Sequence, residues 1–289
     1  MTILDAITDA IERAEWLDAV ADRISPLVGR LAPAGPVKDT LSGTWLGHPL
    51  HPAAVLLPLS CLTSATLLDQ MGVDPDGATA RRLIGVGVLL ALPAAASGLS
   101  DWSDTSEAER RIGVVHAAAN AVALGLYGLS WARRRRGRGR LLALCGAGAL
   151  ALSGSLGGHL AYAQGVGVDT TAFESGPQEW TAVADEADVH DGELTEVTAN
   201  DMSLLLTRQD GRVLALANRC THRGAPLTDG SIDKGCVVCP WHGSRFDLWT
   251  GEVVRGPATR PQPRFETRAV GGNVEVRRDE VRSLRTNPV

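Results

Sequence analysis

Net charge is low in this sequence, and the lack of a basic excess limits the partners that it can bind. Its 289 residues include 28 Lys and Arg against 33 Asp and Glu, which gives a net charge of −5. A nucleic-acid-binding domain usually carries a strongly basic face, so we expect no nucleic-acid partner. The one basic run, residues 133–140, lies between two hydrophobic segments, where membrane topology accounts for it.

Cysteine is also scarce, and no flavin- or nicotinamide-binding motif is present. Of the five cysteines, Cys61 and Cys145 lie inside apolar segments, and Cys236 has no obvious partner. We expect these three to be structural, because free cysteine commonly packs as a small buried hydrophobe. The cysteine count therefore does not decide the redox compartment.

The other two cysteines lie in two short loops that each add a histidine. Cys220-Thr-His222 and Cys239-Pro-Trp-His242 give the pattern C-x-H-x16-C-x-x-H. Two thiolates and two imidazoles suit a Rieske [2Fe–2S] centre, in which two His replace two Cys on one iron. A tetrahedral zinc site is the alternative, although zinc motifs usually group their Cys and their His separately.

The flanking residues favour the first reading, because residues 178–278 resemble a Rieske ferredoxin-type domain. The matching segments are Cys-Thr-His-Arg-Gly-Ala-Pro-Leu (220–227), Cys-Pro-Trp-His-Gly-Ser-Arg-Phe-Asp (239–247) and Gly-Glu-Val-Val-Arg-Gly-Pro-Ala (251–258). The resemblance implies an all-β, iron–sulfur-protein-like fold in which Cys220 and Cys239 hold the inner iron. It also implies that His222 and His242 hold the outer, more exposed iron, and that the last segment is a proline loop covering the cluster.

Departures from the family pattern predict a modest reduction potential. Rieske subunits of cytochrome bc complexes carry a disulfide between two extra loop cysteines, and those positions here are Ala225 and Trp241. The family's potential-raising Ser and Tyr fall on Ser244 and Phe246, so one donor is kept and one is lost. We expect a potential below the cytochrome bc type, with Trp241, Ser244 and Pro257 around the cluster.

Four apolar segments dominate the first half of the chain, and each is close to the length of about 20 residues that spans a bilayer. They cover residues 50–70, 83–100, 112–132 and 141–163. The second and fourth are rich in Gly, Ala and Ser, which allows close helix packing in lipid. These features predict a membrane all-α four-helix bundle in contact with lipid.

The N-terminus is predicted to be one amphipathic helix over residues 1–31, ending at Pro33–Pro36. It has no basic start and so is no signal peptide. Its acidic polar face fits packing on the rest of the protein, or a position on the membrane surface.

Arginine placement predicts the orientation of the bundle. The loops at 72–82 and 133–140 share one side and hold most of the arginines near the spans: Arg81, Arg82, Arg133–Arg136, Arg138 and Arg140. The positive-inside rule puts this side in the cytoplasm and the Rieske domain on the extracytoplasmic face of a bacterial cell membrane. The arginine run also resembles an internal twin-arginine export signal.

Polar residues gather at the other end of the predicted bundle. They are His48, His51, Asp101, His116, Asn120 and His159. Residues 31–168 resemble an uncharacterised family of four-helix bacterial membrane domains. The matching segments are Gly-Thr-Trp-Leu-Gly-His-Pro-Leu-His-Pro (43–52), Gly-Leu-Ser-Asp-Trp (98–102), His-Ala-Ala-Ala-Asn (116–120), Gly-Gly-His-Leu-Ala-Tyr (157–162) and Gly-Val-Gly-Val (165–168).

Ionisable groups in a membrane domain are functional candidates, and three readings of this end stay open. His116 and His159, with His51 as an alternative, could hold a b-type haem between helices. The same groups could bind quinone or handle protons. They could also form a hydrogen-bonded cap without a cofactor.

The predicted organisation has five parts. They are an N-terminal helix and entry loop (1–47), a transmembrane domain (48–168), a linker (169–177), a Rieske domain (178–279) and a tail (280–289). No catalytic iron-binding domain of an oxygenase follows the Rieske motif. We therefore expect an electron carrier or oxidoreductase subunit, working between a membrane donor (quinol or haem) and a redox partner protein. A quinol-oxidising oxidoreductase and a redox sensor or scaffold are the alternatives, and nothing in the sequence indicates an oligomeric state.

Overall fold

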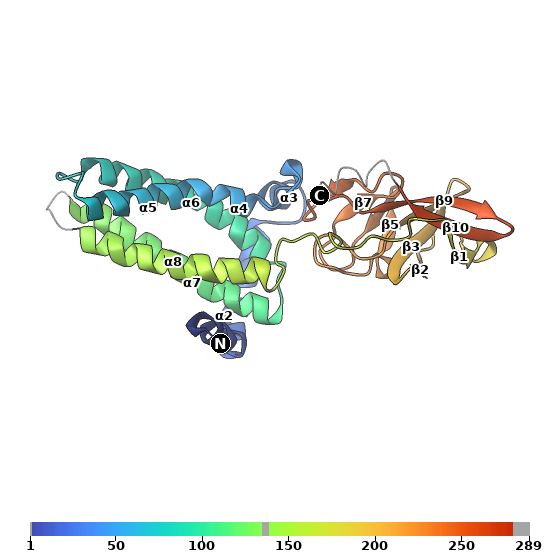
Figure 1. The fold of residues 1–289 in the computed structure, drawn as a ribbon, viewed down its shortest axis with the longest axis horizontal. Helices are drawn as coiled ribbons and strands as arrows, with labels where there is room; N and C mark the ends of the chain where they lie inside the picture. Colours follow the sequence, from blue (N-terminus) through green and yellow to red (C-terminus); the bar gives the residue numbers. More distant parts are fainter. Residues whose placement is uncertain (1, 135–138, 280–289) are drawn as a thin grey trace. The chain divides into compact units, whose positions relative to one another are not determined.

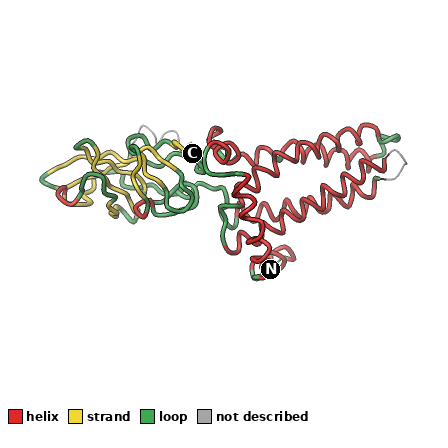
Figure 2. Tube along the Cα trace, turned by 180° about the vertical axis from the view of Figure 1, so that it is seen from behind, coloured by secondary structure: helices red, strands yellow, loops and turns green. Residues whose placement is uncertain are grey.

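The computed structural model describes residues 2–134 and 139–279, which form two compact units. The first unit holds the chain up to Pro33 and residues Pro49–Val166; the second holds Ala34–His48 and the chain from Gly167 onward. The first unit is helical, while strands are confined to the second (Figure 2). The predicted combination of a four-helix bundle and an all-β domain is therefore confirmed.

Within the described residues, four helical segments are long and apolar enough to cross a membrane, as predicted. The first span, Leu50–Met71, is divided at Val55, because Pro58 has no N–H to bond the carbonyl four residues earlier. The segments are α4 (Leu50–Ala54) with α5 (Leu56–Met71), α6 (Ala78–Trp102), α7 (Glu107–Arg133) and α8 (Arg140–Tyr162) (Figure 1).

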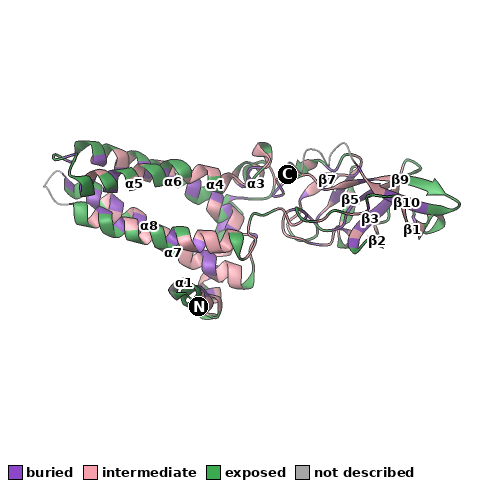
Figure 3. Ribbon diagram, in the orientation of Figure 1, coloured by how far each residue is buried: buried purple, intermediate pink, exposed green. Residues whose placement is uncertain are grey.

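Small residues let these helices approach one another. A Cβ on Gly87 would lie 2.9 Å from the Leu62 side chain, and one on Gly146 would lie 3.0 Å from the Tyr127 ring. The helices also carry exposed positions (green in Figure 3), and large apolar residues such as Leu56, Leu89 and Leu141 are among the exposed residues. Apolar residues outside and small residues at the contacts are the arrangement that a lipid environment favours.

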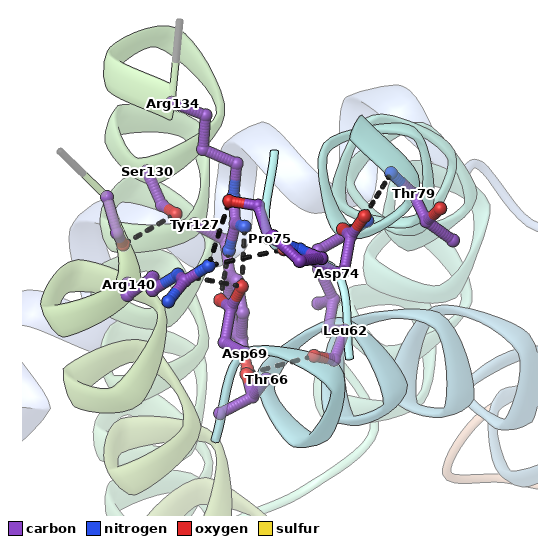
Figure 4. A network of polar contacts seen from close by, with 12 residues as sticks. Leu62, Thr66, Asp69, Asp74, Pro75, Thr79, Tyr127, Ser130, Arg134 and Arg140 are labelled. Atoms are coloured by element: carbon purple, nitrogen blue, oxygen red, sulfur yellow. Dashed lines mark hydrogen bonds and ion pairs between the residues drawn. The ribbon is translucent and has the colours of Figure 1, made fainter. Parts of the chain in front are cut away.

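At the arginine-rich end, a buried ion pair joins the two helical hairpins of the bundle. Arg134 donates two hydrogen bonds to the carboxylate of Asp69, one of them 2.8 Å long from Nη1 to Oδ1 (Figure 4). Arg140 Nη2 donates to the carbonyls of Asp74 and Pro75, at 3.2 Å each. Part of the predicted arginine run thus has a structural partner; Arg135, Arg136 and Arg138 lie outside the described residues.

The prediction of one N-terminal helix was wrong. The segment forms α1 (Ile3–Glu12) and α2 (Trp16–Leu31), and a turn separates them. Arg111 of α7 explains the break, because it donates to the Glu12 carbonyl that ends α1 (2.6 Å) and to the Asp18 carboxylate on α2 (2.6 and 2.9 Å). The acidic face therefore packs on the bundle, which is one of the two predicted alternatives.

The second unit contains two antiparallel sheets. The larger has the order β1-β10-β9-β4-β3-β2 and the smaller has the order β5-β6-β7-β8. The larger sheet comprises β1 (Thr181–Asp185), β2 (Thr195–Ala199), β3 (Met202–Gln209), β4 (Arg212–Ala217), β9 (Arg264–Val270) and β10 (Asn273–Arg278). The smaller comprises β5 (Ser231–Asp233), β6 (Cys236–Val238), β7 (Arg245–Asp247) and β8 (Val253–Arg255).

Strand β3 contributes to both hydrophobic cores of this unit, because successive side chains point to opposite faces. Leu204 and Leu206 pack with Phe265 in one core. Leu205 packs in the other core with Phe246 and with Cys220 and Cys239. The two cysteines are therefore held on the side of the sheet where the smaller sheet packs.

Two segments differ from the predicted division. Residues 34–48, which include α3 (Pro36–Ser42) and the 3-10 turn η1 (Thr44–Leu46), fold with the second unit. Residues of the predicted linker also pack there: Thr170 Oγ1 donates to the Cys220 carbonyl at 2.7 Å. Both segments owe their position to contacts with residues distant in sequence.

Candidate metal centre

Two loops with the same hydrogen-bond pattern carry the four predicted ligands. In the loop after β4, the Cys220 amide donates to the Ala225 carbonyl (2.9 Å), and the Gly224 amide donates to the Cys220 carbonyl (2.8 Å). In the loop after β6, the Cys239 amide donates to the Ser244 carbonyl (2.8 Å), and the Gly243 amide donates to the Cys239 carbonyl (3.1 Å). Each loop thus closes on its cysteine by the same spacing along the chain.

Glycine is required at the fourth position after each cysteine. Gly224 has φ +78° and Gly243 has φ +70°, a left-handed conformation that other residues rarely adopt. A Cβ on Gly243 would also lie 2.9 Å from the guanidinium of Arg255. These glycines allow the chain to turn back, so that both a thiol and an imidazole leave each loop.

The two cysteines meet in the protein interior and are electrostatically unequal. Cys220 and Cys239 are 0% and 3% exposed. A hydrogen bond between the two sulfurs is the main cause that raises the pKa of Cys220 well above its ordinary value and lowers that of Cys239 to about 6. Cys239 is therefore the more readily deprotonated of the two, and the thiolate is the form that binds metal.

The two histidines form the second pair of donors. The rings of His222 and His242 lie 5.0 Å apart, nearly perpendicular. Both side chains are partly exposed, although their Nδ1 atoms are buried. Burial, followed by the neighbouring His242, lowers the pKa of His222 well below its ordinary value. A neutral imidazole is the ligating form.

This donor set fits a Rieske cluster. In the part of the chain that the structure describes, no three His, Cys, Asp or Glu side chains gather as ligands of one metal ion, and the four donors lie instead as two pairs. Two sulfurs and two imidazoles, one pair for each iron, are what a Rieske centre requires. Cys220 and Cys239 would hold one iron, and His222 and His242 the other.

The three residues predicted to surround the cluster lie in the second ligand loop or in the loop after β8. Ser244 is fully buried, and its Oγ accepts a hydrogen bond of 3.0 Å from the Ala258 amide. A hydroxyl has one hydrogen to donate, and this contact leaves that hydrogen available for a cluster sulfur. Pro257 lies beside Ala258 in the loop after β8. Trp241 is 58% exposed, and the centroid of its ring lies 6.4 Å from that of His242, with the two rings nearly perpendicular.

Sequence reasoning missed a buried glutamine that frames the first ligand loop. Gln262 is fully buried; its Oε1 accepts from the Thr221 amide (3.2 Å) and its Nε2 donates to the carbonyls of Ala217 and Arg219 (2.7 and 2.6 Å). One side chain thus satisfies three backbone groups, which a buried loop requires. The only signal in the sequence was the polar side chain of Gln262 within a segment to which no function was assigned.

The comparisons with known proteins agree with this geometry. Residues 179–266 match the family described as Rieske [2Fe-2S] domain. The chain is 32% identical over 83 residues to the ferredoxin component of the naphthalene 1,2-dioxygenase/salicylate 5-hydroxylase systems of a Ralstonia species. That match covers 29% of this chain and 80% of the relative. The chain belongs to the Rieske family.

Two other similar proteins also match about a third of the chain. Human apoptosis-inducing factor 3 is 34% identical over 96 residues, which are 33% of this chain and only 16% of that protein. The solved structure of the Sphingomonas yanoikuyae B1 ferredoxin is 32% identical; the match covers 35% of this chain and all of that one, with a TM-score of 0.33. All three relatives align with about a third of this Rieske protein.

The remainder of this Rieske protein matches a second family. Residues 47–170 match the family described as Predicted membrane protein (DUF2231). This match covers the four candidate spans, and it confirms the resemblance that the histidine-containing segments predicted. The chain is therefore a Rieske domain joined to a predicted membrane domain.

The membrane half distributes its predicted site residues among several hydrogen bonds. His116 Nδ1 lies 2.8 Å from the Ser153 carbonyl, and its Nε2 lies 3.1 Å from Asn120 Nδ2. His51 Nδ1 lies 2.9 Å from the Ala94 carbonyl. Carbonyl oxygens only accept, so both Nδ1 atoms donate, and both Nε2 atoms carry a lone pair.

The structure pairs His51 with His116, whose rings lie 6.4 Å apart. His159, predicted as the partner of His116, instead contacts the Glu12 carboxylate through Nε2 at 2.8 Å. His48 belongs to the segment that folds with the second unit, and Asp101 is partly buried near the end of α6. Glu12 was not predicted, because a contact across 147 residues has no local pattern.

Proposed function

We propose that this Rieske protein carries single electrons from a quinol in the membrane to a redox partner protein. The observation that carries the proposal is the set of two matched ligand loops, found on a chain with four candidate membrane spans. The cluster supplies the one-electron chemistry. Cys220, Cys239, His222 and His242 hold it, and the partly exposed imidazoles offer the side on which a partner can approach.

The acceptor is proposed to be a protein that recognises the exposed edge near His242 and Trp241. The Ralstonia relative is named as the ferredoxin component of dioxygenase and hydroxylase systems. By analogy, we propose a partner oxidoreductase that receives one electron in each encounter. Trp241 is 58% exposed, which gives this edge an aromatic contact of the kind enriched at interfaces.

Quinol is favoured over haem as the membrane donor by the hydrogen bonds of the bundle histidines. His116 uses both ring nitrogens, toward Ser153 and Asn120, and His159 contacts Glu12. Neither imidazole is arranged as an axial ligand. The Nε2 lone pair of neutral His51, whose Nδ1 bonds the Ala94 carbonyl, suits acceptance of a hydroxyl hydrogen, as quinol oxidation requires.

For orientation, we propose that the Rieske domain lies on the extracytoplasmic face. The arginines at the opposite end of the bundle support this by the positive-inside rule. Arg134 also stabilises the bundle through its ion pair with Asp69. The arginine run at 133–140 would therefore contribute both to export and to the fold of the membrane anchor. Replacing Arg133–Arg136 with Lys, followed by protease protection in spheroplasts, should leave the Rieske domain protected if the run directs export.

The deciding experiment is anaerobic reduction of the purified full-length protein by a short-chain quinol, followed by visible and EPR spectra. We expect Rieske bleaching with quinol and with dithionite, and no sharp α-band. Bleaching with dithionite but not with quinol would contradict the donor while leaving the cluster intact. A sharp α-band in the reduced-minus-oxidised spectrum would restore the haem reading.

A further inference from the structure

Residues 34–48 precede the first span in sequence yet fold against the loop that contains Pro257. The Asp39 carboxylate accepts a hydrogen bond of 3.0 Å from the Gly256 amide. The Thr44 hydroxyl donates to the Ala258 carbonyl at 3.2 Å. Both residues that flank Pro257 are therefore held by one short segment, across more than 200 residues of sequence.

The contact is close enough to restrict the sequence of the loop. A Cβ on Gly256 would lie 2.3 Å from the Thr44 Oγ and 3.1 Å from the Asp39 carboxylate. No side chain fits there without moving α3 and η1 away. The absence of a side chain at Gly256 lets both polar groups reach the backbone, so loop and segment are matched in shape and in hydrogen bonding.

From this loop, a further hydrogen bond leads to the cluster loops. The backbone carbonyl of Ala258 accepts a hydrogen bond from Thr44, and the backbone amide of Ala258 donates to the buried Ser244 Oγ at 3.0 Å. The position of Ala258 therefore decides in which direction the Ser244 hydroxyl can donate. A hydrogen bond from a hydroxyl to a cluster sulfur raises the reduction potential, because it stabilises the added negative charge.

We propose that residues 34–48 are a clamp on the proline loop, in which Asp39 and Thr44 are positioning residues that orient Ser244 and raise the cluster's reduction potential. The match to the Rieske family covers residues 179–266, so residues 34–48 lie outside it. The proposal rests on cluster binding, and it does not depend on which donor or acceptor the protein uses.

A buried charge in the clamp acts in the same direction. Lys38 is 6% exposed and lies within electrostatic reach of His222. A fixed positive charge near the cluster favours its reduced, more negative state. The clamp thus contributes both an oriented hydroxyl, through Ala258, and a cationic group.

The test is an EPR-monitored redox titration of the full-length protein and of single variants. Thr44→Val removes the hydroxyl at constant shape, and Thr44→Ser keeps it. We expect Thr44→Val to lower the equilibrium constant for reduction about threefold to tenfold, where tenfold corresponds to 59 mV for one electron. Thr44→Ser should keep the wild-type midpoint. EPR reports only molecules that hold a cluster, so partial loss of cluster leaves the midpoint readable.

Asp39 and Lys38 provide independent pairs. Lys38→Met should lower the midpoint, whereas Lys38→Arg should preserve it. Asp39→Ala should give a lower midpoint than Asp39→Asn, because both variants remove the carboxylate charge and only Asn still accepts from the Gly256 amide. A wild-type midpoint in Thr44→Val, together with equal midpoints in Asp39→Ala and Asp39→Asn, would overturn the proposal. Equal shifts in Thr44→Val and Thr44→Ser would also overturn it, because the hydroxyl would then have no part in the effect.

Discussion

The two halves of the chain use histidine in different ways. In the Rieske domain, His222 and His242 extend from tight loops, and their rings lie 5.0 Å apart beside a pair of cysteines. In the membrane half, His51 and His116 extend from helices and bond the carbonyls of neighbouring helices. Residue type is the same in both, but the backbone around it decides what each imidazole can do.

The difference follows from how each half satisfies its backbone. The ligand loops close on themselves by backbone hydrogen bonds, which frees their side chains for a cofactor. The helices of the bundle also satisfy their own backbones, but polar side chains among them must find partners because lipid offers none. Histidines in the bundle therefore join helices, and Gly98 and Gly157 leave room for them: a Cβ there would lie 2.8 and 3.1 Å from His51 and His116.

The largest effect is expected when a cluster ligand of the Rieske domain is replaced. Replacing Cys239 with Ser or His242 with Ala should abolish the Rieske EPR signal and the bound iron and sulfide. In either variant, one of the two irons loses one of its two protein ligands. Cys236→Ser and His190→Ala are the matched controls, since both lie in the same domain outside the two loops. Loss of the signal in the controls would contradict the assignment.

An intermediate effect is expected at the arginine-rich end of the bundle. Asp69→Asn leaves Arg134, whose side chain is 4% exposed, as a buried charge without its carboxylate. Breaking such a pair costs about 3–5 kcal/mol, which should lower the unfolding temperature in detergent, followed by circular dichroism. The double variant Asp69→Leu with Arg134→Leu should recover much of this loss, and Arg133→Ala, at an exposed position, should have little effect.

The smallest effect sharpens the contrast between the two kinds of histidine. His116→Ala removes the hydrogen bonds of the ring to the Ser153 carbonyl and the Asn120 amide, which costs about 1–3 kcal/mol. We expect reduced stability of the bundle and an unchanged content of iron and sulfide per chain. Cluster loss in His116→Ala, at a temperature where the protein remains folded, would show that the two halves are not chemically independent.

Features that depend on short stretches of sequence were predicted from it. The ligand pairs follow from loops closed within six residues, and the spans follow from length and hydropathy. The family resemblance added the proline loop and Ser244, which no spacing rule would supply. The prediction of four spans was confirmed, because length and hydropathy are properties of neighbouring residues.

Contacts between distant residues were not predictable in the same way. The break between α1 and α2 depends on Arg111, about 100 residues later in the sequence. The pairing of His159 with Glu12 and the clamp on the proline loop have the same character. Periodicity showed a continuous apolar face over residues 1–31, and only the tertiary partner determines where that helix ends.

The clamp has a consequence for biosynthesis, because it makes the cluster domain discontinuous in the chain. Thr44 and Ala258 are separated by 214 residues, which include all four candidate spans. At about 5–20 residues per second, the ribosome completes the second partner roughly 10–40 s after the first. The Rieske domain therefore reaches its final form only after the whole membrane segment has been made.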